Sequence, residues 1–396
     1  MNSNFVKPRY DSGGFAHLPH YIKEVFEKKE YKKVLFFLID GFGWRFYEEY
    51  KTHPFFVELA KHGSVRKITS QFPSTTAVHV TTWHTDLPVG ESGVLEWQYY
   101  EPKLDAIFAS LLFSYAGTSK RDTAKSSGID PRELYPTENI YSALNSLGVD
   151  AHIFQNQGIV PSTYSDIVTE GAKLHGYQTF SEAMVNLRIL LKEAKSPSYI
   201  GFYFGDVDGI MHKYGPTAPQ TRAEIETTLD ALLNQFLLPL KEDLPGETLF
   251  LFTADHGHAE VDPKTTIFIN RDPKFAGVEK FLKRNKAGEL LVPSGSPRDF
   301  FLYIKEDLLD EAQEFFQSRL AGKADVVKTQ ELIDAGYFGE TISETFLSRV
   351  GNLVILSYLH ESVWWYEKDN FEMNYYGHHG GLTPEEMEIP LISAEF

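Results

Sequence analysis

The sequence predicts an α/β protein with a central, mostly parallel sheet and a small α+β insertion. Three apolar segments carry this prediction, and each ends in polar residues and glycine: VLFFLI at 34–39, YIGFYF at 199–204 and TLFLFT at 248–253. Short apolar runs of this kind are typical of strands that are buried on both faces. Amphipathic stretches between them, such as 181–194 and 217–240, predict helices that cover the sheet.

The composition restricts the class of protein. The 396 residues are 42% hydrophobic, which is enough for a large core. The net charge of −17 is spread along the chain and disfavours binding to a nucleic-acid polymer. The chain has no cysteine, so any metal ion must use His, Asp, Glu or hydroxyl ligands. We see neither an apolar signal-peptide core nor a run of about 20 apolar residues, and therefore expect a cytoplasmic protein with no membrane partner.

The first strand ends in Asp40, which Gly41 follows. In open α/β sheets ligands bind beyond the carboxyl ends of strands, so Asp40 is a candidate site residue; the alternative is an ordinary turn aspartate. A helical stretch within 46–62 follows, with Pro54 starting its second part. Next comes QFPSTTAVHVTTWHT, in which Ser74, Thr75 and Thr76 are N-cap types before a predicted helix. Hydroxyls at a helix N-terminus suit an anion, although a plain capping cluster explains this segment equally well.

Two further strand ends carry acids and imidazoles. After a predicted helix at 139–147 and a strand at 151–154, the strand at 199–204 runs into GDVDGIMHKYGP. Asp208 and His212 are four residues apart and face the same way on a helical turn, where they can share one ion. The strand at 248–253 ends in Asp255 and His256. Both pairs also occur by chance in turns, so neither is decisive alone.

The chain changes character at residue 276. We expect an inserted α+β cap at 276–346, with helices at 277–286 and 308–320 and strands at 300–304 and 324–327. The core is expected to comprise 1–275 and 347–396, with 352–358 returning to the main sheet and a last strand at 389–392. The late segment GHHGG frames His379 with glycines, and a histidine in such a loop has little packing role, which favours an ion ligand.

These candidates form one set of three carboxylates and three imidazoles without sulfur. Two zinc-like ions with about three protein ligands each would use the whole set and keep open positions for water or substrate. Two such ions form the clamp used for in-line displacement at phosphorus, and coordination can activate a threonine hydroxyl. The set is Asp40, Asp208, His212, Asp255, His256 and His379, with a hydroxyl cluster near Thr76.

The order D-G, F-P-S-T-T, D-x-x-x-H, D-H-G and H-G resembles the alkaline phosphatase superfamily, and within it the type I phosphodiesterase/nucleotide pyrophosphatase family. FPSTT…TDLPVGESGV is similar to the nucleophile stretch of that family, DGIMHKYGP to its D-x-x-G-H-x-Y-G-P motif, and HHGGLTPEEM to its late G-x-H-G segment. The motifs span residues 34–392. The resemblance implies an alkaline-phosphatase-like three-layer sandwich.

The resemblance also implies residue roles. Thr76 would be the nucleophile, forming a phosphothreonine that water then hydrolyses. Asp208, His212 and His379 would hold one ion, and Asp40, Asp255 and His256 the other, with Thr76 bridging toward the substrate. We expect two divalent ions, zinc first, with manganese or iron as alternatives. The expected partner is a small-molecule phosphate ester, and the sequence leaves the oligomeric state open.

Two positions depart from the family pattern. Ala77 stands where nucleotide hydrolases carry an aromatic residue that stacks on the base. Trp97 stands where they carry an asparagine that binds a phosphate oxygen, and Gln98 or a backbone N–H is the candidate replacement. We assign four other histidines to structural or supporting roles: His79, His84, His258 and His378.

The expected function is therefore hydrolysis of phosphodiester or pyrophosphate bonds. The alternatives are a phosphomonoesterase, phosphonate hydrolase or phosphosugar mutase of the same superfamily, or a non-catalytic metal-binding regulatory protein. A sulfatase is disfavoured because the C/S-x-P-x-R motif of that branch is missing at the nucleophile stretch.

Overall fold

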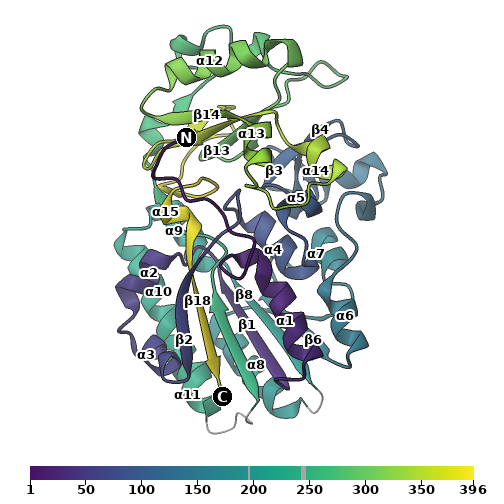
Figure 1. The fold of residues 1–396 in the computed structure, drawn as a ribbon, viewed down its shortest axis with the longest axis vertical. Coiled ribbons are helices and arrows are strands. Elements are labelled where there is room, and N and C mark those ends of the chain that lie inside the picture. Colours follow the sequence, from purple (N-terminus) through teal and green to yellow (C-terminus); the bar gives the residue numbers. More distant parts are fainter. Residues whose placement is uncertain (195–196, 242–246) are drawn as a thin grey trace.

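The computed structural model describes residues 1–194, 197–241 and 247–396, and a seven-stranded sheet runs through the lower half of the molecule in Figure 1. The sheet is parallel except for β18, which is antiparallel to both of its neighbours. The predicted mostly parallel sheet is confirmed. In spatial order its strands are β2 (Gly63–Thr69), β18 (Glu388–Glu395), β9 (Thr248–Thr253), β1 (Lys33–Ile39), β8 (Ser198–Phe204), β6 (Asp150–Asn156) and β7 (Lys173–Tyr177).

Strand β1 lies inside this sheet and is buried along its whole length. Its neighbouring side chains point to opposite faces, since Phe36 packs on Trp83 and Phe37 packs on Phe236. Helices therefore cover both faces and form the outer layers of a three-layer sandwich (Figure 1). One layer contains α1 (Leu18–Glu27), α4 (Thr76–Thr85), α6 (Ile140–Ser146) and α7 (Thr163–Val168); the other contains α2 (Trp44–Tyr50), α3 (Pro54–Ala60), α8 (Phe180–Glu193), α10 (Pro219–Ala231), the π-helical η5 (Leu232–Leu237) and α11 (Leu238–Lys241).

A second, antiparallel sheet of four strands lies at the other end of the molecule (Figure 1). It packs on α12 (Leu309–Arg319) and has its own apolar core, whose members run from Ile269 to Trp365. Its strands are β12 (Ser294–Gly295), β13 (Asp299–Leu302), β15 (Leu353–Ser357) and β14 (Ala324–Lys328). The exact division of the chain at residues 276 and 346 stays a prediction.

Two expectations about this region are wrong. Residues 352–358 do not return to the main sheet, because β15 pairs with β13 and β14. Its apolar sequence fits a central strand of either sheet, and periodicity cannot tell which sheet a strand joins. The helix expected at 277–286 is only a short 3-10 turn, Val278–Lys280. The residues that follow form single bridges instead, with Leu282 opposite Ile304 and Arg284 opposite Leu290.

Among the described residues, no helix has the length and apolar character needed to cross a membrane.

The remaining elements connect the two sheets. The smaller elements are α5 (Val89–Ser92), β3 (Gln98–Glu101), β4 (Ala106–Ala109), β5 (Ser114–Tyr115), α9 (Asp206–Tyr214), β10 (Ala259–Glu260), β11 (Ile267–Phe268), α13 (Thr329–Asp334), α14 (Glu344–Arg349), β16 (Val363–Trp364), β17 (Gly377–His378) and α15 (Pro384–Met387).

Candidate functional site

The predicted site residues meet at one edge of the main sheet. Because β1, β8 and β9 are parallel, their carboxyl ends lie together, and Asp40, Asp208 and Asp255 follow these three ends. The later loop brings His379 to the same place, where its ring stacks on the ring of His256 with centroids 3.7 Å apart. All seven predicted side chains thus lie around one centre.

Thr76 lies against the first group of ligands. Its Oγ1 is 3.2 Å from Asp40 Oδ2 and 3.2 Å from His256 Nε2. The same His256 Nε2 is 3.3 Å from Asp40 Oδ1 and 3.4 Å from Asp255 Oδ2. Ligand atoms of Asp40, Asp255 and His256 all lie within 4.8 Å of one another, so the three can share one ion.

Asp208 is the centre of the second group. Its Oδ2 is 3.5 Å from His212 Nε2, as expected for two residues four apart on α9, and its Oδ1 is 3.6 Å from His379 Nε2. A further residue, His258, lies closer, with Nε2 only 2.6 Å from Asp208 Oδ1. The tightest group, with ligand atoms within 4.8 Å of one another, contains His258 in place of His212 and comprises Asp208, His256, His258 and His379.

The hydrogen bonds at Nδ1 separate the three predicted ligand histidines from His258. His212 Nδ1 donates to Gly377 O at 2.9 Å, His256 Nδ1 to Gly257 O at 3.1 Å, and His379 Nδ1 to Ser74 O at 3.0 Å. A carbonyl only accepts, so these rings carry their proton on Nδ1 and keep a free lone pair on Nε2, the arrangement typical of metal ligands. His258 is reversed: its Nε2 donates to the Asp208 carboxylate, and its Nδ1 has no partner among the described residues. We therefore assign His258 to the support of Asp208.

Burial sets the charge of these groups. It lowers the pKa of His256 and of His379 well below the usual range, so both imidazoles are neutral. Burial, together with the nearby acids, raises the pKa of Asp40 well above its ordinary value and that of Asp255 to about 7. Burial would also raise the pKa of Asp208, but the imidazoles beside it lower that pKa below the usual range.

The donor set fits divalent cations. Three carboxylates and three imidazoles converge, and Asp255 Oδ2 is buried without a hydrogen-bond partner among the described residues. An unpartnered buried oxygen between two other acidic groups is costly unless a cation or a proton neutralises it. Nitrogen and oxygen ligands without sulfur suit zinc, manganese or iron.

Two cavities open on Thr76. One has a volume of about 400 Å³, and its walls include Gly295, Ser296 and Trp364 from the second sheet and its surroundings. The other has a volume of about 250 Å³ and mostly apolar walls, with Arg121 among its lining residues. Thr76, Trp97 and Asp208 line both cavities. Trp97 is 43% exposed and forms part of the wall of each.

The two departures from the family pattern have different consequences. Ala77 is fully buried and therefore offers no surface for stacking. Gln98, the candidate replacement for the missing amide, lines the larger cavity, as does Glu96.

The Glu96 side chain is 1% exposed; its Oε2 accepts from Trp97 N, and its Oε1 has no partner among the described residues. Burial raises the pKa of Glu96 to about 7.

Sequence reasoning missed two residues at this site, Tyr203 and Glu96, and the partner of a third, His258. Tyr203 OH donates to Asp40 Oδ2, and Tyr203 also lines the smaller cavity. Its aromatic strand pattern indicated a core residue, which hid this role. Glu96 carried no signal, because a single glutamate in a loop is common. His258 was assigned a supporting role, but the sequence did not identify Asp208 as its partner.

Two other histidines are used by the fold. His79 Nε2 accepts from Gln71 N at 2.8 Å, and its Nδ1 donates to Thr75 O at 2.7 Å. Burial lowers the pKa of His79 to about 4 and that of His84 to about 3. His84 bonds Tyr141 OH through Nδ1 at 2.5 Å. Both side chains therefore support helix α4, which begins at Thr76.

Comparisons with known proteins agree with this geometry. The model of the family "Type I phosphodiesterase / nucleotide pyrophosphatase" matches residues 34–382. Ectonucleotide pyrophosphatase/phosphodiesterase family member 7 of Rattus norvegicus is 24% identical over 294 residues, which are 72% of this chain and 62% of that relative. The chain therefore spans less than two thirds of the length of the curated relative it matches.

Solved structures show the same fold. Murine ectonucleotide pyrophosphatase/phosphodiesterase 5 matches with a TM-score of 0.67 at 20% identity, covering 91% of this chain and 88% of that one. The human protein matches with a TM-score of 0.67 at 17% identity, covering 91% and 87%. An inactive murine variant, solved in complex with AMP, matches with a TM-score of 0.65 at 20% identity, covering 91% and 87%. The predicted alkaline-phosphatase-like architecture is thereby confirmed.

Proposed function

Since the chain belongs to the type I phosphodiesterase/nucleotide pyrophosphatase family, we propose that it hydrolyses phosphodiester or pyrophosphate bonds with Thr76 as nucleophile and two divalent ions as cofactors. One ion would be held by Asp208, His212 and His379. The other would be held by Asp40, Asp255 and His256, with Thr76 beside it. When bound, the two ions would neutralise charge on the phosphoryl oxygens and promote ionisation of the threonine hydroxyl.

One observation supports a phosphodiester over a phosphomonoester as the substrate. Two separate cavities meet at Thr76, one of about 400 Å³ and one of about 250 Å³. A phosphodiester has two substituents on phosphorus, and each needs its own space when the nucleophile attacks in line. A phosphomonoester would leave one cavity without an occupant. The paired cavities therefore favour a diester or a pyrophosphate.

The protein side chains orient the attack. Asp40 Oδ2 accepts from Thr76 Oγ1 at 3.2 Å and so turns the hydroxyl lone pairs away from the sheet. Tyr203 OH donates to the same carboxylate and restrains it. Thr76 Oγ1 would lose its proton and attack phosphorus, and the bond to the leaving alcohol or phosphate would break. Water would then cleave the bond between Thr76 Oγ1 and phosphorus, which frees the phosphate product and restores the threonine hydroxyl. The rate enhancement from these side chains comes from holding the nucleophile and the substrate in one reactive geometry.

Two residues bear on whether the substrate is a nucleotide. Ala77 provides no stacking surface, and Trp97 cannot accept or donate as an asparagine does. We infer that a nucleobase is not held in the manner of those enzymes. Gln98, which lines the larger cavity and carries a side-chain amide, is the candidate donor to a phosphoryl oxygen.

The test compares esters on one purified preparation whose metal content is measured. We expect about two divalent ions per chain, by the ligand count of two three-ligand sites. We also expect faster hydrolysis of bis(para-nitrophenyl) phosphate than of para-nitrophenyl phosphate. Preference for the monoester, or for a phosphonate, would favour the other branches of the superfamily.

Thr76→Ala separates a catalyst from a metal-binding regulatory protein. The substitution removes the nucleophile but none of the six charged or imidazole ligands. We expect kcat/KM to fall about a thousandfold or more while the ions stay bound. An unchanged low rate in both proteins, with the ions present, would favour the non-catalytic alternative.

A further inference from the structure

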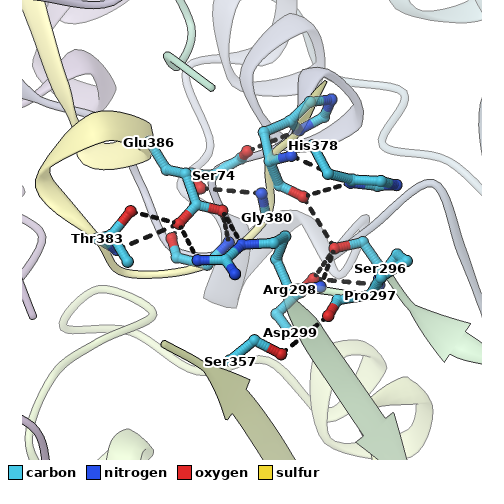
Figure 2. A network of polar contacts seen from close by, with 12 residues as sticks. Ser74, Ser296, Pro297, Arg298, Asp299, Ser357, His378, Gly380, Thr383 and Glu386 are labelled. Carbon is cyan, nitrogen blue, oxygen red and sulfur yellow. Dashed lines mark hydrogen bonds and ion pairs between the residues drawn. The ribbon is translucent and has the colours of Figure 1, made fainter. Parts of the chain in front are cut away.

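A buried ion pair joins the second sheet to the loop that carries His379. Arg298, which directly precedes β13, donates from Nε to Glu386 Oε1 and from Nη2 to Glu386 Oε2, each at 2.9 Å (Figure 2). Both side chains are fully buried. The pair is bidentate, so it fixes direction as well as distance.

Each partner also holds backbone of its surroundings. Glu386 accepts from Gly381 N at 3.0 Å and from Thr383 Oγ1 at 2.7 Å, which ties down the end of the His379 loop (Figure 2). Arg298 Nη1 donates to Tyr358 O at 2.7 Å and also to Glu361 O. The ion pair therefore connects three chain segments that are far apart in sequence.

Two serines continue this connection to His379 itself. Ser296 Oγ, two residues before Arg298, donates to His379 O at 2.9 Å (Figure 2). From the other side, Ser74 O accepts from His379 Nδ1 at 3.0 Å, and Ser74 Oγ donates to Gly381 O at 2.8 Å. Ser74 lies two residues before Thr76. The nucleophile segment and the His379 loop are thus held against each other and against the second sheet.

Stability alone does not explain a buried pair at this place. Burying two charges costs desolvation, and apolar residues of similar size commonly give equal or greater stability. What apolar residues cannot give is a fixed orientation of Gly381 and Thr383. Ion binding depends on such orientation, because partners beyond the direct ligands commonly change affinity by about ten- to a hundredfold.

We propose that Arg298 and Glu386 are positioning residues for the metal centre: they hold the His379 loop so that His379 Nε2 stays beside Asp208. This inference rests on the proposed function only in requiring that His379 binds an ion. It makes the second sheet part of the ion site, and not only a wall of the larger cavity.

The experiment measures ion affinity in Arg298→Met by competition with a chromophoric chelator. We expect zinc to bind the site of Asp208, His212 and His379 about ten- to a hundredfold less tightly than in the wild type. The cobalt-substituted protein should show a changed visible spectrum, and raised zinc concentration should restore hydrolysis. Lys283→Met, which removes an exposed pair with Glu306 in the same region, is the matched control and should change nothing.

Ser296→Ala provides the second variant in case Arg298→Met does not fold. It removes the hydroxyl that bonds His379 O, and with it the contacts of that hydroxyl with Asp299 Oδ1 and Arg298 N. We expect a smaller loss of affinity in the same direction. Wild-type affinity in folded Arg298→Met, or in Ser296→Ala if the first variant does not fold, would overturn the proposal. A wild-type protein that binds no ion would instead contradict the proposed function.

Discussion

At the scale of single residues, the bond at Nδ1 determines what each histidine of the centre can do. His212, His256 and His379 donate from Nδ1 to a carbonyl and keep Nε2 for an ion, whereas His258 donates from Nε2 to Asp208. Residue type and spacing predicted the first three. They could not predict the pairing of His258 with Asp208, because that pairing depends on where α9 lies relative to the turn after β9.

The assignment of His212 and His258 leads to opposite expectations for two variants. His212→Ala removes a ligand and should leave about one tightly bound ion per chain. His258→Ala removes one hydrogen bond to Asp208 and should keep both ions, with affinity lowered about tenfold. Metal analysis after gel filtration measures both. Loss of an ion from the His258 variant alone would reverse the assignment.

Glu96 predicts a pH dependence of stability. Burial raises the pKa of Glu96 from 4.5 to about 7, so the folded protein keeps the proton that the unfolded chain has already lost. The protonated Glu96 side chain contributes its full stabilisation of the folded state below pH 4.5, and this stabilisation is lost as the pH rises through about 7. A shift of this size corresponds to on the order of 3 kcal/mol.

Glu96→Gln measures that contribution, because glutamine stays neutral. The measurement is urea unfolding at a series of pH values. Between pH 4.5 and 7, the free energy of unfolding of the variant should rise relative to that of the wild type. The other acids are present in both proteins and cancel in the difference, with the exception of Asp299, whose pKa is raised by burial and also by the Glu96 carboxylate. Parallel curves would mean that Glu96 titrates normally.

At the scale of elements, burial explains which strands could be predicted. β1, β8 and β9 lie inside the sheet, and their apolar sequences identified them. β2 and β7 lie at its two edges, are largely exposed, and gave no apolar signal. The strand at 352–358 was recognised but placed in the wrong sheet, because pattern carries no information on partners.

The packing of β8 on α4 gives a prediction at this scale. A Cβ at Gly201 would lie 2.5 Å from Trp83 Cζ2 and 2.8 Å from Ile153 Cδ1. Gly201→Ala should therefore cost about 1–3 kcal/mol in urea unfolding, because the core cannot accept the added methyl group. It should also lower kcat, since Trp83 belongs to the helix that begins at Thr76.

Gly209→Ala is the control for this packing effect. Gly209 lies within α9, and a Cβ there meets nothing within 4 Å. Alanine favours a helix interior by up to about 1 kcal/mol relative to glycine, so this variant should be as stable as the wild type or more stable. Equal destabilisation of both variants would contradict the packing argument.

At the scale of the whole molecule, the site depends on segments from residue 40 to residue 379. The sequence predicted the sandwich and the seven side chains because parallel strands end at one edge. It could not predict the ties among them, such as Tyr203 to Asp40 or Arg298 to Glu386, since these contacts exist only after the second sheet has docked.

Removal of the ions should therefore lower the stability of the entire folded protein. Ligands that bind only the folded state stabilise it in proportion to the logarithm of their concentration, by about 4 kcal/mol at a thousand times Kd. We expect chelation to lower Tm by several degrees in scanning calorimetry and re-addition of zinc to reverse the change. Asp255→Asn with His256→Ala, which disrupts one site, should show a smaller shift. A Tm that does not change on chelation would contradict a metal centre whose ligands come from distant segments of the chain.

The antiparallel strand β18 has a consequence for biosynthesis. Residues 388–395 occupy an interior place in the sheet, between β2 and β9. On a translating ribosome the first two of these three strands are exposed long before the third leaves the exit tunnel, so two open edges await a late arrival. The nascent protein is most vulnerable to aggregation and most dependent on chaperones during this interval, and a messenger truncated before the codon for Glu388 would yield a chain that cannot close its sheet.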